Sequence, residues 1–167
     1  MFRFLLVILL SISACDYSSN GVNSQAIQPL GEGNVSTGTV QTFTNEFMDL
    51  INQHRIDIGL HPLLIEEGIG NLASQHSLNM ATGAVAFGHL GFSARCLEAK
   101  SLLGGGNLCA ENVAMGQMSP SAVFTSWMNS PGHRANIEQS RVTHTGFGYA
   151  QSTSGVYYWT QIFMELN

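Results

Sequence analysis

The chain changes its hydrophobic period once, and this change constrains the fold more than any other feature of the sequence. Between residues 43 and 128, apolar side chains recur at helical spacing in three segments. Between residues 142 and 163 they alternate with polar ones, and β-branched and aromatic residues are frequent. Residues 152–155 (Ser-Thr-Ser-Gly) separate two alternating runs and predict the turn of a β-hairpin. Helices followed by an antiparallel hairpin predict an α+β domain whose helices cover the sheet.

The helical segments have recognisable ends. We expect the first helix to begin at an N-cap Thr44 and to end near Gly59. The second runs from about residue 66 to 81 and is terminated by Gly83. Residues 84–95 are interrupted by glycines and predict a short strand or a loop.

Two serine–proline pairs mark the starts of two consecutive helices. A serine at the N-cap can accept a hydrogen bond from the first turn, and proline at the first helical position loses only an N–H that would be unpaired. Ser119-Pro120 begins the helix that contains Trp127, and Ser130-Pro131 begins the next. His133 therefore lies in the first turn of a helix at a sharp bend, which makes it a candidate functional residue.

The N-terminus has the pattern of a targeting segment. Arg3 precedes an apolar run over residues 4–12 that is too short to span a bilayer. Small residues then lead to Cys15, which resembles a bacterial lipobox, so we interpret residues 1–14 as a lipoprotein signal peptide. The alternative is a secretory signal with an ordinary cleavage site. We expect acylation of Cys15, for example with palmitate, to anchor the exported protein to a membrane on its periplasmic or extracellular side.

Residues 15–41 are rich in small polar residues and poor in large apolar ones, so we interpret them as a flexible tether. Residues 42–167 are long enough for one domain with a substantial core. The formal net charge is −5 and no basic residues cluster, which argues against nucleic acid as a partner. We expect the protein to be a monomer.

The two cysteines that remain after Cys15 are Cys96 and Cys109. In an exported protein such a pair predicts a disulfide. Closing a loop of this size contributes about 3 kcal/mol in the chain-entropy model. The alternative is a nucleophilic cysteine paired with a histidine, which an oxidising compartment disfavours.

Four polar residues lie at bends defined by glycines or helix caps: His89, Glu111, Ser130 and His133. Two imidazoles and a carboxylate are a familiar zinc ligand set with a fourth position open to water. They are equally compatible with a hydrogen-bonded structural cluster, in which Ser130 serves only as an N-cap. The residue types therefore give zinc or another divalent metal, held by His89 and His133, as the candidate cofactor, and leave the structural cluster as the alternative.

The motifs occur in an order that resembles one family. The chain is similar to bacterial members of the CAP superfamily, or SCP domain, which includes cysteine-rich secretory proteins, antigen 5 and plant pathogenesis-related group 1 proteins. The resemblance covers about residues 42–163. The motifs that support it lie at residues 52–55, 59–63, 73–81, 88–95, 110–114, 127–137, 146–150 and 158–163.

The resemblance implies an α-β-α sandwich with a central antiparallel sheet. It also implies a cleft with two histidines and two acidic residues, sometimes with a bound metal such as zinc. His89 and His133 match the two histidines, and Glu111 matches the first acidic residue. Ser130 occupies the position of the second, so a pocket here would be less acidic than in family members with the full set.

Three functions are compatible with these observations. The first, which we favour, is a non-enzymatic extracytoplasmic binding module for a lipid, glycan or protein ligand, as the resemblance implies. The second is a hydrolase, either a serine type using Ser130, His133 and Glu111 or a metal type activating water at His89 and His133. The third is a structural envelope protein that holds partners together.

Overall fold

The computed structural model describes residues 37–166. The predicted signal peptide, Cys15 and residues 15–36 of the predicted tether lie outside the described residues. The first helix, α1 (Thr37–Asp57), begins ahead of Thr44, so the prediction of an N-cap at Thr44 is wrong. Over residues 37–166, no helix combines the length and the apolar character needed to cross a membrane.

A four-stranded sheet in the order β1-β3-β4-β2 forms the centre of the domain. The predicted hairpin is confirmed as β3 and β4, and β2 pairs with β4 in antiparallel orientation. Only β1, which is parallel to β3, departs from the antiparallel arrangement. The strands are β1 (Leu64–Ile65), β2 (Cys109–Met115), β3 (His144–Gln151) and β4 (Tyr157–Met164).

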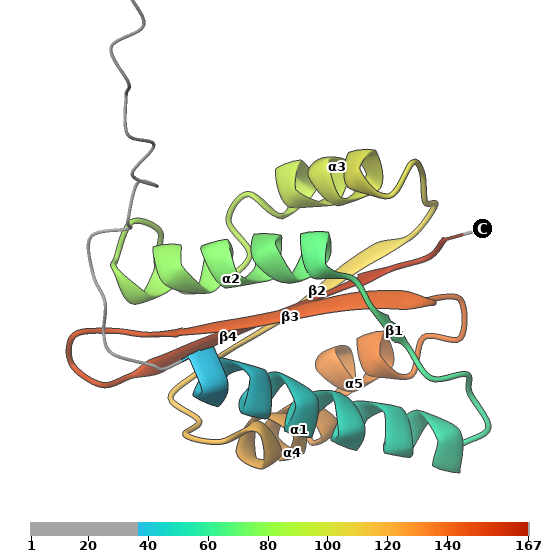
Figure 1. Cartoon of the computed structure of the whole chain (residues 1–167), viewed down its shortest axis with the longest axis horizontal. Helices are drawn as coiled ribbons and strands as arrows, with labels where there is room; N and C mark the ends of the chain where they lie inside the picture. The colour runs from blue at the N-terminus through green and yellow to red at the C-terminus, as the bar shows by residue number, and fades with distance from the viewer. Residues whose placement is uncertain (1–36, 167) are drawn as a thin grey trace, which may run out of the picture. The chain divides into compact units, whose positions relative to one another are not determined.

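Helices cover both faces of this sheet (Figure 1), which confirms the predicted α-β-α sandwich. One face carries α2 (Glu67–Ala81) and α3 (Phe92–Leu102). The other carries α1, α4 (Pro120–Met128) and α5 (Pro131–Ile137). The two predicted serine–proline helix starts are confirmed, because α4 and α5 begin at the two prolines.

The two layers have different cores. The layer beneath α1, α4 and α5 contains five buried aromatic side chains among aliphatic ones: Phe47, Trp127, Phe147, Trp159 and Phe163. The layer beneath α2 and α3 is smaller, with Ile69, Ala73, Ala99, Ile162 and Met164. The thin second layer lets α2 approach the sheet closely. A Cβ on Gly148 would overlap the backbone nitrogen of Ser74 in α2, and a Cβ on Gly146 would overlap that of Gly70.

The prediction of a strand or loop over residues 84–95 is confirmed as a loop over residues 84–91 and is wrong for residues 92–95, which begin helix α3. The helix begins at Phe92, after Gly91 in the left-handed conformation (φ +80°). Among its side chains only Cys96 and Ala99 are buried, so its apolar periodicity is too weak to show in the sequence. The predicted disulfide between Cys96 and Cys109 is confirmed, with the two Cα atoms 6.0 Å apart, and it attaches α3 to β2.

Arg55 is a fully buried arginine in α1. Its guanidinium donates to four backbone carbonyls: His61 (2.9 Å), Ile137 (2.6 Å), Gln139 (3.1 Å) and Val142 (3.3 Å). Burial lowers the pKa of this guanidinium from its ordinary value. The side chain thus connects the end of α1 with the end of α5 and with the segment that leads into β3.

Candidate functional site

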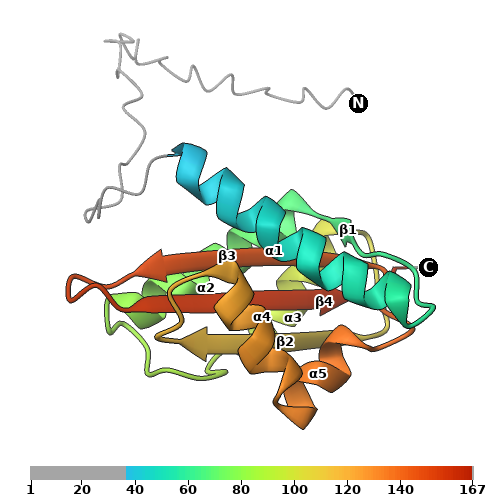
Figure 2. The ribbon, with the colours of Figure 1, turned by 90° about the horizontal axis from the view of Figure 1, so that it is seen from below.

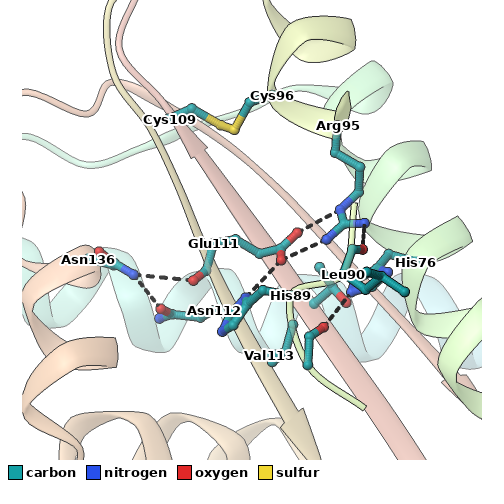
Figure 3. Close-up of polar contacts among 12 residues, drawn as sticks. His76, His89, Leu90, Arg95, Cys96, Cys109, Glu111, Asn112, Val113 and Asn136 are labelled. Atoms are coloured by element: carbon teal, nitrogen blue, oxygen red, sulfur yellow. Dashed lines mark hydrogen bonds and ion pairs between the residues drawn. A yellow bond between two sulfur atoms is a disulfide. The ribbon is translucent and has the colours of Figure 1, made fainter. Parts of the chain in front are cut away.

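The carboxylate of Glu111 is the centre of a polar cluster on β2 (Figure 3), and its side chain is only 1% exposed. Its two oxygens accept hydrogen bonds from Nε and Nη2 of Arg95, both at 2.8 Å, in a bidentate arrangement. Oε1 also lies 2.9 Å from Nδ1 of His89. Since Arg95 belongs to α3, the helix that the sequence did not predict supplies the cation that neutralises this buried carboxylate.

The contact with Glu111 determines which nitrogen of His89 is free. A carboxylate only accepts hydrogen bonds, so Nδ1 carries the proton and Nε2 of the neutral ring retains a lone pair. The His89 side chain is 50% exposed, in contrast to Glu111. The ring therefore offers Nε2 to a ligand while its other nitrogen is fixed from within the protein.

The loop that contains His89 is held by two further hydrogen bonds. Nε2 of His76, a buried residue of α2, donates to the Gly88 carbonyl at 2.8 Å. Nη1 of Arg95 donates to the Leu90 carbonyl at 2.8 Å. Burial is the main reason that the pKa of His76 is lowered, which favours the neutral ring. These bonds hold the backbone on both sides of His89.

Two asparagine amides connect α5 to β2. Nδ2 of Asn112 donates to the backbone carbonyl of His133 at 3.0 Å. Nδ2 of Asn136 donates to Oδ1 of Asn112 (2.8 Å) and to the backbone carbonyl of Glu111 (3.3 Å). This network places His133 within electrostatic reach of His89. Burial, and secondarily the electrostatic interaction with His89, lowers the pKa of His133 and favours its neutral form.

Ser130 occupies the N-cap of α5, but its side chain makes no cap hydrogen bond. The expectation that its hydroxyl is used in capping is therefore wrong, whereas Ser119 does cap α4 by accepting from the Ala122 N–H at 3.2 Å. The N–H of Ser130 donates to the Trp127 carbonyl (3.1 Å), and its carbonyl accepts from Arg134 (2.9 Å). The tight junction of α4 and α5 thus starts the second helix without help from the serine hydroxyl.

An open cleft of about 370 Å³ lies beside His89 and Glu111, and its other lining residues are Phe92, Cys109, Ala110 and Asn136. The structure therefore brings two of the four predicted cleft residues into direct contact. His133 lies nearby without lining the cleft, and Ser130 does not line it.

The donor set is a limited fit to a metal ion. Over residues 37–166, no group of three or more His, Cys, Asp or Glu side chains is arranged to hold one. Both oxygens of Glu111 are engaged by Arg95 and His89, so this carboxylate positions a ring and is not free to act as a ligand. The remaining donors are the imidazoles of His89 and His133.

Sequence reasoning assigned no role to three residues that build this site: Arg95, Asn112 and Asn136. A signal for Arg95 was available, because the chain contains only six Lys and Arg residues. An arginine in a chain so poor in charge is a candidate partner for a carboxylate such as Glu111. The asparagines gave no comparable signal, since their partners are mostly backbone atoms and each other.

Comparisons with known proteins agree with the fold. Residues 48–163 match the model of the cysteine-rich secretory protein family, CAP. The uncharacterised protein YkwD of Bacillus subtilis strain 168 is 34% identical over 128 residues, which make up 75% of this chain and 48% of the relative. The chain thus spans about half the length of that curated relative.

Solved structures of three bacterial proteins resemble this domain. An extracellular SCP-domain protein from Bacillus anthracis has a TM-score of 0.66 at 25% identity, and the match covers 80% of this chain and 45% of the Bacillus chain. A cysteine-rich secretory protein from Staphylococcus aureus has a TM-score of 0.64 at 23% identity, covering 78% and 40%. An outer surface protein of Borrelia burgdorferi has a TM-score of 0.64 at 18% identity, covering 80% and 97%. The latter two, at their low identity, bear on the fold alone.

Proposed function

This chain belongs to the cysteine-rich secretory protein (CAP) family, and we propose that it is an exported, membrane-anchored module that binds a ligand at the cleft beside His89. The observation that carries this proposal is the arrangement around Glu111. The buried carboxylate, neutralised by Arg95, fixes the proton on Nδ1 of His89 and leaves Nε2 available on the exposed side of the ring. A group held this rigidly is suited to recognition, because little side-chain entropy is lost when a ligand binds.

The lining of the cleft indicates the ligand chemistry. Phe92 and Ala110 offer apolar surface, while His89 and Asn136 offer polar groups. A matching ligand carries a polar group next to an apolar surface. Lipids, glycans and protein segments have this combination, and these are the ligand classes that we propose. The extracellular location named for the Bacillus anthracis relative supports an extracytoplasmic role.

A divalent metal such as zinc is a second proposed occupant. Its ligands would be the imidazoles of His89 and His133, both of which can be neutral, and it would polarise a ligand oxygen. Two protein donors fall short of the three or four found in typical zinc sites. We therefore expect weak binding that depends on both histidines.

The hydrolase alternative finds no support in the geometry. A serine mechanism needs a carboxylate to orient His133. Glu111 instead accepts its hydrogen bonds from Arg95 and His89. A metal mechanism would rest on two donors only. Binding without turnover is the function that the arrangement favours.

Replacing His89 with alanine is expected to weaken ligand binding at the cleft at least tenfold without unfolding the protein, since this ring is half exposed. The full chain would be tested against vesicles of defined lipids, soluble glycans and peptides, with and without Zn²⁺, by calorimetry. His61→Ala removes an exposed imidazole outside the cleft and is the matched control. Binding that survives both His89→Ala and His133→Ala, or turnover that His133→Ala abolishes in a folded protein, would contradict the proposal.

The proposed anchor is tested separately at Cys15. In the native host the chain is expected to incorporate labelled palmitate and to sediment with membranes, because acyl chains add about 0.8 kcal/mol per buried methylene. Cys15→Ser should abolish the label, and mass spectrometry should show the loss of the acyl mass. Cys96→Ser removes a different cysteine and should keep the label. An unlabelled wild-type chain would refute the anchor and leave the cleft proposal intact.

A further inference from the structure

Strand β3 has an open edge on the side of the sheet opposite to the His89 cleft. The strand order separates β3 from β2 by β4, and β1 pairs with β3 only at His144 and Thr145. Beyond Thr145, β3 continues to Gln151 without a partner strand on this side among the described residues. More than half of the strand is therefore an unpaired edge, which natural proteins usually cover or shorten.

The pairing of β1 shows which main-chain groups this edge presents. The N–H groups of Leu64 and Glu66 donate to the carbonyls of Thr143 and Thr145, both at 2.9 Å. The N–H and C=O of one residue point to the same side of a strand, and successive residues alternate. Phe147 and Tyr149 therefore direct their main-chain groups outward beyond the end of β1.

A groove of about 430 Å³ runs along this edge. Helices α1 and α2, which lie on opposite faces of the sheet, flank β3 (Figure 2). The groove is lined by Thr44 and Met48 of α1, Ile65 of β1, Gly70, Asn71 and Ser74 of α2, Phe147 of β3, and the carboxylate residues Glu66 and Glu67. It thus combines an apolar wall, small residues that leave space, and acidic groups at one end.

At the acidic end, no cation among residues 37–166 forms an ion pair with Glu66 or Glu67. Residues 16–41 contain no Lys, Arg or His, so the preceding segment of the chain cannot supply one. Charge complementarity therefore points to a basic group from another molecule.

We propose that this groove binds an extended peptide segment of another protein, which adds to β3 as a strand and places a lysine or arginine beside Glu66 and Glu67. Main-chain hydrogen bonds to Phe147 and Tyr149 would supply the part of the affinity that does not depend on the peptide's sequence, as in other cases of strand addition. Alternate side chains of the peptide would contact the groove and the acidic end would select a basic residue. This surface is independent of the His89 cleft.

The test uses the full chain in mild detergent and a capped peptide of alternating valine and threonine with one lysine near its end. The amide signals of Phe147 and Tyr149 are expected to shift on titration, and the peptide should protect these amides from hydrogen exchange. Asn71→Trp, which fills the groove from an exposed position of α2, should weaken binding at least tenfold. Gln75→Trp lies on the same helix outside the groove lining and should bind normally.

Charge and main-chain contributions are separated by two further comparisons. The double variant Glu66→Gln with Glu67→Gln should weaken binding about threefold or more, whereas Glu98→Gln on α3 should have no effect. A peptide N-methylated at alternate positions should not bind, because it cannot pair with β3. Binding that is unaffected by Asn71→Trp would overturn the proposal, as would edge amides that are already protected in the full chain without peptide.

Discussion

Replacing Gly148 with alanine is expected to destabilise the domain by about 3 kcal/mol or more, because the added methyl group has no space. Its Cβ would overlap the backbone nitrogen and Cα of Ser74 as well as the serine hydroxyl. Backbone atoms cannot rotate away, so α2 would have to move off the sheet. That movement would also break the hydrogen bond from Ser77 Oγ to the Gly148 carbonyl, which measures 3.1 Å.

The measurement for Gly148→Ala is urea unfolding followed by far-UV circular dichroism. Gly132→Ala is the matched control: Gly132 lies in α5, and a Cβ there would meet no heavy atom within 4 Å. This control should be neutral or slightly stabilising, since alanine favours a helix over glycine. A Gly148→Ala protein as stable as the wild type would show that α2 does not lie directly on β3.

Replacing Arg55 with leucine is expected to cost at least about 3 kcal/mol of unfolding free energy. The change leaves four carbonyls without their charged donor in the interior, and each buried unsatisfied group costs about 1–3 kcal/mol. Arg55→Lys should recover only part of the loss, since an ammonium group lacks the planar fork that reaches several acceptors at once.

The control for Arg55 is Arg141→Leu. Arg141 pairs with Glu165 at 2.7 Å, but its side chain is 58% exposed. Exposed ion pairs contribute roughly 0–1 kcal/mol, so this variant should unfold close to the wild type. Equal losses for the two leucine variants would mean that the carbonyls around Arg55 are satisfied in another way.

Local sequence patterns predicted most of the elements correctly. The period change at residue 142 predicted the β3–β4 hairpin, and the Ser-Pro pairs predicted the starts of α4 and α5. Helix α3 was missed because it buries only two side chains and is attached through the Cys96–Cys109 disulfide. The disulfide contributes to holding α3 on the domain, and the helix has too few buried apolar side chains to show a helical period in the sequence.

The site was predictable in part. Only the resemblance to the family placed His89, Glu111 and His133 in one cleft, since 22 positions separate His89 from Glu111. Their spacing alone is equally compatible with unrelated structural roles. Glu111 was predicted as a member of an acidic pocket, whereas the structure shows a carboxylate saturated by Arg95 and His89.

The sequence by itself determined the types of most elements, the α+β class and the consecutive helix starts around Ser130, because periodicity and serine–proline pairs are patterns of residues a few positions apart. Only the tertiary structure decided that Arg95 neutralises Glu111, that Arg55 donates to the carbonyl of Ile137 82 positions away, and that β3 keeps an open edge. Each of these depends on groups that the packing of α1, α3 and β1 brings together. The geometry of such groups is set by the assembled layers and not by any local pattern.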